Sequence, residues 1–326
     1  MGDERGPETC TSTAFTVTLG PLVPDTLVIL NPWSGRGRGR RFRPQVLRGL
    51  KDAGIAFDLA ETTGPGHALG LARDAARAGV RRLIIAGGDG TIHEVVNGLM
   101  QAGLGEDGAT RCPFGVIPLG TGNDFAKLVG VYKLPPGIAA ARLARAEERR
   151  FDVGKALGEY FDNMMGAGFD AEVVRQSNRI RRLKGVAVYL VAIYKTFVFF
   201  RPPRLEVRTA GYSETGEMMF VAVSIGVSAG GSFYLTPQAD PEDGQLDVCL
   251  IRRVGVPTFL AAVPKVMKGT HGKLDEVELF RAPSVTIRSA DGNPLVLQLD
   301  GELREPGLME VEVTLEPRRL RVLVGR

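Results

Sequence analysis

The sequence has few cysteines and no stretch long enough to cross a membrane. Its three cysteines, Cys10, Cys112 and Cys249, lie far apart without CxxC spacing. They predict neither a disulfide framework nor a zinc site, and we expect a protein of the reducing cytoplasm. The most apolar stretch, Val186–Phe200, has 15 residues and includes Lys195, whereas a membrane-spanning helix needs about 20 residues.

The chain also lacks a leader pattern and a strong charge of either sign. Its first 23 residues contain no basic segment followed by an apolar run, so no signal peptide is expected. Their Ser, Thr, Gly and Pro content predicts a flexible extension over residues 1–23. The net charge of +4 suits nucleotide phosphates or an acidic membrane surface, but is too small to indicate nucleic-acid binding. A solvated surface explains most of these charges most simply.

What is present is an alternation of strand and helix patterns from Thr26 onward. The 326 residues, 44% of them hydrophobic, favour two globular domains. Apolar runs that predict strands cover residues 26–30, 55–61, 81–86 and 114–119, with helices between them. This order predicts a parallel α/β sheet with helices on both faces and a ligand site at the carboxyl ends of the strands.

After about Arg149 the pattern changes to short alternating segments separated by Gly, Pro and Asp turns, which predict an antiparallel β domain. Helices are expected over Ile180–Phe200 and Val256–Lys268. The first begins with basic residues, and we favour a core helix over a basic collar beside an acyl-binding wall. We assign residues 24–148 and 317–326 to the α/β domain and residues 149–316 to a β-sandwich.

The turn Gly87-Gly88-Asp89-Gly90-Thr91 follows a buried strand. Its glycines allow the backbone to approach a bulky ligand, and Thr91 with Glu94 predicts a capping box that opens a helix at Thr91. A helix start behind glycines is a phosphate-binding arrangement. Asp89 would repel phosphate unless it faces Mg²⁺ or a ribose hydroxyl. A tight turn without a ligand is the alternative.

Two more polar turns follow strands of the same predicted sheet. Asn31–Arg36 offers short polar side chains and a permanent cation. Gly120–Asp124 places Thr121, Asn123 and Asp124 at a helix start, where a simple N-cap is the alternative role of Asn123. Three polar turns at one edge of a sheet favour a binding site over three unrelated turns.

Acidic clusters mark two loops of the β domain. Asp240, Asp243, Gln245 and Asp247 offer oxygen ligands that suit a hard cation such as Mg²⁺, although a solvated turn is the usual explanation of such a loop. Asp300-Gly301-Glu302 ends an apolar strand. From the local residues alone, a type I′ hairpin turn is favoured there over a catalytic carboxylate.

The chain resembles the diacylglycerol kinase catalytic family, which includes bacterial lipid kinases and the sphingosine and ceramide kinases. The motifs that carry the resemblance are, in chain order, NPWSG, GGDGT with IHEVVNGL, PLGTGNDFA, DPEDGQLDV and the late DGE. The resemblance runs from about Leu27 to Gly325. GGDGT is shared with NAD kinases. NPxSG, GTxNDFA and DGE together point to lipid kinases.

That resemblance implies an NAD-kinase-like α/β domain, a β-sandwich and a lipid acceptor between them. Asp300 would be the general base, and Asp124 and Arg36 would join an ionic network. Relatives often carry Lys at the position of Arg36. A structural Mg²⁺ would be held by Asp240, Asp243 and the carbonyl of Gln245. The residues implied to hold ATP are Asn31, Pro32, Trp33, Ser34, Gly35, Thr62, Gly87, Gly88, Asp89, Gly90, Thr91, Ile92, His93 and Thr121.

The expected protein is therefore an ATP- and Mg²⁺-dependent kinase for a lipid hydroxyl, with diacylglycerol as the first acceptor and peripheral contact with a membrane. A sphingoid base, phosphatidylglycerol or a polyprenol are alternative acceptors, and a second copy of the chain is a candidate partner. An NAD kinase is the alternative enzyme. A nucleotide-binding regulator without catalysis is a third alternative, but Asp89 and Asp300 are both present. No GxGxxG follows the first strand, which disfavours a Rossmann oxidoreductase.

Overall fold

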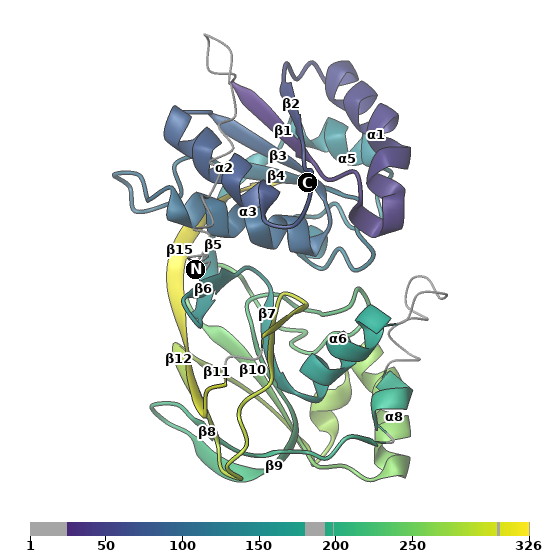
Figure 1. The fold of residues 1–326 in the computed structure, drawn as a ribbon, viewed down its shortest axis with the longest axis vertical. Helices are drawn as coiled ribbons and strands as arrows, with labels where there is room; N and C mark the ends of the chain where they lie inside the picture. The colour runs from purple at the N-terminus through teal and green to yellow at the C-terminus, as the bar shows by residue number, and fades with distance from the viewer. Residues whose placement is uncertain (1–24, 180–192, 198, 305–306, 326) are drawn as a thin grey trace, which may run out of the picture.

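The computed structural model describes residues 25–179, 193–197, 199–304 and 307–325. Two domains lie one above the other (Figure 1). In the first, parallel strands pair in the order β4-β3-β1-β2. Their bounds are β1 Thr26–Leu30, β2 Asp58–Glu61, β3 Arg82–Gly87 and β4 Phe114–Pro118.

Helices cover both faces of this sheet. Because crossovers between parallel strands are right-handed, the strand order places the helix after β1 on one face and the next two on the other. Figure 1 shows these as α1 with α5, and α2 with α3. Their bounds are α1 Ser34–Asp52, α2 His67–Ala78, α3 Asp89–Gln101, the short α4 Phe125–Leu128 and α5 Pro136–Leu143.

The apolar residues of the four predicted strands form the core of this domain. All five residues of β1 and of β4 are buried, as are the last five of β3. This burial on both faces is typical of a parallel sheet covered by helices. Alanines of α2 and α5 and branched residues of α3 pack against it. The expected fold class is confirmed for this domain.

The second domain is a β-sandwich-like unit of antiparallel strands, also as expected. Its strands are β5 Glu147–Ala156, β6 Glu159–Phe161, β7 Met164–Gly168, β8 Arg204–Arg208, β9 Ser213–Ser224, β10 Leu246–Arg252, β11 Val277–Ala282, β12 Ser284–Ser289, β13 Leu297–Leu299 and β14 Glu302–Arg304. Alternating apolar side chains of these strands form a separate core.

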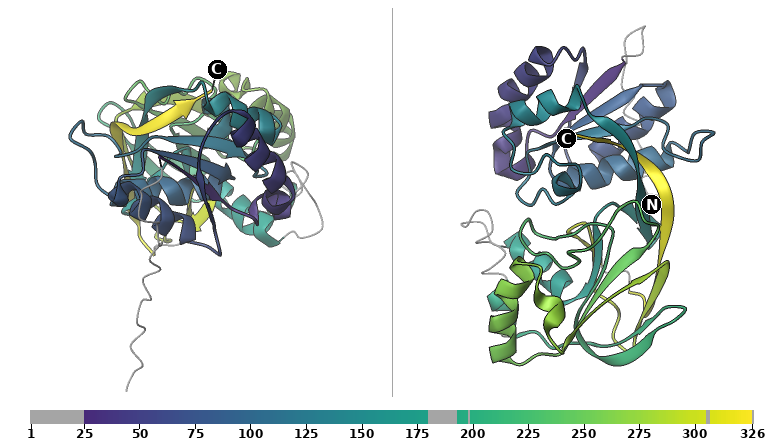
Figure 2. Two further views of the ribbon diagram at one scale, coloured as in Figure 1. Left: turned by 90° about the horizontal axis from the view of Figure 1, so that it is seen from above. Right: turned by 180° about the vertical axis from the view of Figure 1, so that it is seen from behind.

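One long strand joins the two domains. We assigned residues 317–326 to the first domain and the residues before them to the second, and β15 crosses this boundary as one strand over Glu310–Val324. It pairs with β12 at one end, and Val322 pairs with Phe114 of β4 at the other. Its pairing with β5 shifts register between Glu316 and Leu320. Figure 2 shows β15 running beside both domains. A strand can cross from one domain to the other when it pairs with strands of a different domain at each end.

Helices α6 Phe169–Arg179 and α8 Val256–Met267 lie together at one side of the second domain (Figure 1), and the short 3-10 turn η1 His271–Lys273 follows α8 in the chain. They form a third apolar cluster with β9 and β10. The helix over Val256–Lys268 was expected, whereas α6 was not. Of the helix expected over 180–200, residues 180–192 fall outside the described ranges, as does the N-terminal extension, and residues 193–197 are helical. Within the described residues, no helix is long and apolar enough to cross a bilayer.

Candidate active site

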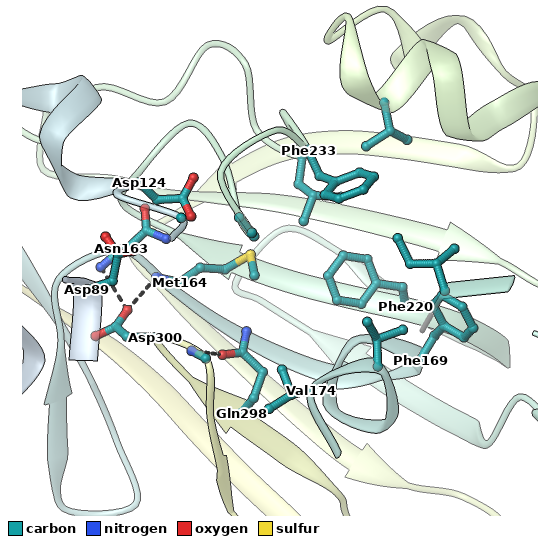
Figure 3. A pocket seen from close by; sticks show the side chains of 18 of the residues that line it. Asp89, Asp124, Asn163, Met164, Phe169, Val174, Phe220, Phe233, Gln298 and Asp300 are labelled. Carbon is teal, nitrogen blue, oxygen red and sulfur yellow. Dashed lines mark hydrogen bonds between the residues drawn. The ribbon is translucent and has the colours of Figure 1, made fainter. Parts of the chain in front are cut away.

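One cavity of about 440 Å³ extends from the first domain into the second. Figure 3 shows carboxylates at one end and aromatic rings at the other, with Met164 between them. We call the first part the glycine-lined end, formed by Gly35, Gly88, Gly90, Gly120 and Gly122. The second part is the apolar arm, formed by Phe169, Met219, Phe220, Phe233, Phe259 and Val263. Asp300 lies where the two parts meet.

The β3–α3 turn forms one wall of the glycine-lined end. The helix begins at Asp89 after Gly88, two residues before the start predicted at Thr91. The capping box is wrong, because the Glu94 carboxylate accepts hydrogen bonds from the amides of Gly66 (2.8 Å) and Ala68 (3.0 Å) at the start of α2. The amide groups that begin α3 nevertheless lie at the cavity, as an anion site requires.

Glycine is required where this turn meets the turn after β4. A Cβ atom on Gly88 would lie 2.8 Å from the Cα atom of Gly120, and a Cβ on Gly120 would lie 2.6 Å from the Cα of Gly88. Any larger residue at either position would force the two turns apart. Their contact brings two strand ends to one wall of the cavity.

The carboxylate of Asp89 is held by the chain itself. Its oxygens accept hydrogen bonds from the amides of Asn123 (2.7 Å) and Phe125 (3.2 Å). Burial, together with the nearby charge of Asp124, raises the pKa of Asp89 to about 7. The amide donors offset part of the carboxylate's charge, and burial favours its protonated form, so Asp89 would repel a phosphate less than a bare carboxylate would. Asn123 does not cap α4; its side-chain oxygen accepts a hydrogen bond from the Gly120 amide.

The turn after β1 lies beside the other two turns: a Cβ atom on Gly88 would lie 3.2 Å from the Ser34 hydroxyl oxygen. The Asn31 amide nitrogen donates to the Thr91 hydroxyl at 2.9 Å, which ties this turn to α3. Arg36 is exposed and adopts the left-handed conformation with φ of 60° between two glycines of positive φ. Trp33 is also exposed, and its ring lies 4.7 Å from the Arg40 guanidinium.

Asp124 connects the two domains. Its carboxylate accepts hydrogen bonds from the Ser228 hydroxyl at 2.6 Å and from the Gly231 amide at 2.9 Å, both in the second domain. The Lys127 ammonium lies 2.8 Å from the same carboxylate, and both side chains are more than nine-tenths buried. The sequence pattern did not single out Lys127 as the partner of Asp124. The ionic network of Asp124 with Arg36 stays a prediction.

Asp300 occupies a two-residue turn between β13 and β14. It and Gly301 have φ values of 48° and 84°, the positive values of a type I′ turn, which Asp-Gly favours. The hairpin explanation from the local sequence is confirmed, and the turn also aims Asp300 into the cavity.

Four donors surround the Asp300 carboxylate. The amides of Asp162, Asn163 and Met164 lie at 2.9–3.0 Å, and His93 Nδ1 lies at 2.8 Å. Burial alone would raise the pKa of Asp300. The hydrogen bond and charge of His93, with the Asp162 and Met164 hydrogen bonds, outweigh burial and hold this pKa below its ordinary value.

The acidic loop of the second domain lies away from the cavity lining. Asp240 and Asp243 are exposed and accept hydrogen bonds from the amides of Glu242 and Gln245. Asp152, which is buried, accepts one from Gly244 at 2.8 Å. The sequence pattern gave no reason to single out Asp152, because it lies within a strand.

The structure brings together about half of the site residues predicted from the sequence. Those that line the cavity are Asn31, Ser34, Gly35, Gly88, Asp89, Gly90, Thr91, Thr121, Asp124 and Asp300. Those outside its lining are Pro32, Trp33, Arg36, Thr62, Gly87, Ile92, His93, Asp240, Asp243 and Gln245. His93 lies directly behind Asp300. Lining residues without a sequence signal include Asn163, Gln298 and those of the apolar arm.

Two family models match consecutive parts of the chain. The diacylglycerol kinase catalytic domain matches residues 25–156, and the YegS C-terminal NAD kinase beta sandwich-like domain matches residues 163–324. The chain is thus a kinase with two domains. It belongs to the diacylglycerol kinase family, as its motifs predicted.

Similar proteins agree with this assignment. The chain is 30% identical over 276 residues to the diacylglycerol kinase of Bacillus subtilis, covering 84% of this chain and 88% of the relative. It is 31% identical over 281 residues to a Chromohalobacter salexigens protein named "Probable lipid kinase YegS-like", covering 85% and 86%. These names support the coarse assignment of a lipid kinase.

Solved structures share the fold. A crystal structure of a diacylglycerol kinase from Bacillus anthracis superposes with a TM-score of 0.68 at 21% identity, covering 94% of this chain and 98% of the other. A second structure from that organism has a TM-score of 0.71 at 22% identity, covering 92% and 97%.

Proposed function

We propose that this kinase transfers the γ-phosphate of ATP to the hydroxyl of a lipid, with diacylglycerol as the first acceptor to test and phosphatidic acid as its product. One observation carries the proposal. A single cavity joins a glycine-lined end, suited to phosphates, to an apolar arm, and the two meet at a buried carboxylate. An acceptor with an apolar tail and a hydroxyl head fits this division better than a dinucleotide does.

The glycine-lined end is the proposed ATP site. Glycines in three turns let the backbone approach the phosphates, and the start of α3 adds the favourable end of a helix dipole. Thr91 and Asn31, already hydrogen-bonded to each other at 2.9 Å, supply polar contacts at the same wall. The residues that were predicted to hold ATP but lie outside the cavity lining would contribute by fixing the shape of these turns.

Asp300 is the proposed acceptor of the hydroxyl proton. As the acceptor oxygen bonds to the γ-phosphorus, the bond from that phosphorus to the departing ADP oxygen breaks, and the hydroxyl proton passes to Asp300. Phosphoryl transfer depends mainly on positioning and charge stabilisation, so a carboxylate of low pKa suffices if the proton moves late. Four donors fix its orientation toward the meeting point.

The acidic loop is the proposed Mg²⁺ site. Asp240, Asp243 and the Gln245 carbonyl are hard oxygen donors of the kind that Mg²⁺ prefers. Asp247, at the start of β10 directly after this loop, has a buried carboxylate oxygen without a hydrogen-bond partner among the described residues. These residues fit a structural ion, which would fix the loop against the strand that carries Asp152. Magnesium accompanying ATP would neutralise phosphate charge.

The apolar arm is the proposed lipid site, next to a surface suited to a membrane. Helix α8 turns Phe259 and Val263 toward the arm, while Val256 and Leu260 on the adjoining part of its surface are 58% and 49% exposed. Phe199 is 81% exposed. Apolar side chains exposed in this way favour contact with the membrane interface, from which a lipid would enter the arm.

Two adjacent alanines of α8 provide a matched test. Ala262 lines the cavity, whereas Ala261 is exposed on the same helix. We expect Ala262→Trp to fill the arm and lower kcat/KM for a long-chain diacylglycerol by roughly tenfold or more, leaving the KM for ATP unchanged. Ala261→Trp should behave as the wild type. Equal effects of the two variants would contradict binding of the lipid in the arm.

A further inference from the structure

Two titratable side chains lie behind Asp300, on the side away from the cavity. Asp162 follows β6 and is 2% exposed, and His93 on α3 is 6% exposed. One ligand-type atom from each of Asp162, His93 and Asp300 lies within 4.8 Å of the others. The phosphoryl-transfer step described above uses only Asp300, which leaves the role of a second buried carboxyl group unexplained.

The hydrogen bonds show which carboxyl group bears the charge. Each Asp300 oxygen accepts two hydrogen bonds. By contrast, Asp162 Oδ1 is buried without a hydrogen-bond partner among the described residues. Two carboxylates this close and this buried repel each other when both are ionised, which favours the retention of one proton. Asp162 is the better carrier of that proton, because Asp300 has the donors that stabilise a negative charge.

A bound cation is a weaker explanation of this cluster. His93 Nδ1 already donates to Asp300, and the remaining Asp300 contacts are to backbone amides. A cation would have to displace these contacts. A proton shared between the two carboxyl groups needs no displacement.

We propose that Asp162 is a positioning residue for the phosphotransfer: its protonated carboxyl group donates to Asp300 and keeps a single negative charge at the meeting point of the cavity. This proposal rests on the proposed function. Asp162 keeps its own proton during the reaction, while Asp300 receives the proton of the acceptor hydroxyl. Ionisation of Asp162 would place two like charges side by side and push Asp300 away from its donors.

Other charged groups around the pair support one retained proton. His93 Nε2 lies 3.7 Å from Glu159, which forms an ion pair with Arg304 at 2.7 Å. Burial, the charge and hydrogen bond of Asp300, and the charge of Asp89 raise the pKa of Asp162 well above its ordinary value. The groups that face the pair are His93 and Asp89 from α3, Glu159 from β6 and Arg304 from β14.

Two variants separate positioning from simple packing. Asp162→Asn has no titratable proton but still offers an N–H donor to Asp300, whereas Asp162→Leu has neither. At pH 7 we expect kcat of Asp162→Asn to stay within about threefold of wild type and that of Asp162→Leu to fall by roughly tenfold or more. The wild-type kcat should decline at alkaline pH as Asp162 ionises, and Asp162→Asn should lack that decline. An unchanged alkaline decline in Asp162→Asn would overturn the proposal.

A stability measurement tests the shared proton without any kinase assay. A carboxyl group whose pKa is higher in the folded than in the unfolded protein adds to the free energy of unfolding. This contribution is complete at a pH below the unfolded pKa and is lost as the pH rises toward the folded pKa. The wild-type melting temperature should therefore fall relative to that of Asp162→Asn between pH 5 and pH 9. Parallel curves would overturn the shared proton, whereas a missing kinase activity with diverging curves would overturn only the proposed function.

Discussion

Asp300→Asn removes the proposed proton acceptor with little change to the turn that carries it. Asparagine tolerates positive φ as well as aspartate does, and Asn-Gly is a preferred type I′ pair, so residues 300 and 301 should keep φ values near 48° and 84°. The variant therefore changes charge and hydrogen bonding, while the backbone path stays the same.

The size of the effect follows from the donors around Asp300. The Asn amide group would face either the Asn163 and Met164 amides or the Asp162 amide and His93. Two charge-assisted hydrogen bonds are lost outright, each worth about 1.5–3 kcal/mol, and the other two become neutral. We expect unfolding in urea to show a loss of about 3–6 kcal/mol or more.

The loss of turnover should be seen even when the variant is fully folded. Removal of a general base lowers turnover by about 10²–10⁴-fold. Turnover should be measured with ATP and lipid in mixed micelles, at a temperature where urea titration shows the variant to be folded, and ATP affinity should be measured separately by calorimetry. We expect ATP affinity to be unchanged. Steady-state activity within about tenfold of wild type would refute the proposed role of Asp300.

Three further predictions concern the domain contact, the membrane and the pH dependence of stability. Asp124→Ala removes the only carboxylate paired with the buried Lys127 ammonium among the described residues and should lower the free energy of unfolding by about 3–5 kcal/mol, measured by urea titration; a loss below about 1 kcal/mol would contradict a stabilising role of this ion pair. Leu260→Asp should weaken sedimentation with phosphatidylglycerol vesicles and leave the melting temperature unchanged, with Ile138→Asp on the first domain as control; equal losses would contradict a membrane-facing α8. Burial lowers the pKa of His271 below its ordinary value, so its contribution to stability should be lost as the pH falls below about 6.5; melting curves of wild type and His271→Gln that stay parallel from pH 7 to pH 5 would contradict this.

Much of the first domain is predictable because its strands are continuous apolar runs buried on both faces. The residue types in the turns were also informative. Asn31 and Gly88 follow strands at the same edge of the sheet, and Asp300 begins a hairpin turn. The family motifs added the lipid-kinase assignment, which the relatives confirm.

What escaped prediction depends on contacts between distant segments. Glu94 caps α2 rather than its own helix, and no spacing rule reports that choice. β15 continues across the boundary that we placed between residues 316 and 317, because it pairs with different strands on either side. Asp162 and Lys127 acquire their surroundings only when the domains pack together, so their side chains look ordinary in the sequence.

Transfer of labelled phosphate tests the central claim most directly. The purified chain should be incubated with γ-labelled ATP and Mg²⁺, and separately with micelles of diacylglycerol, sphingosine, phosphatidylglycerol or a polyprenol, or with NAD. Label should appear in a lipid product, and Asp300→Asn should abolish that product. Label in NADP with none in any lipid would contradict the account.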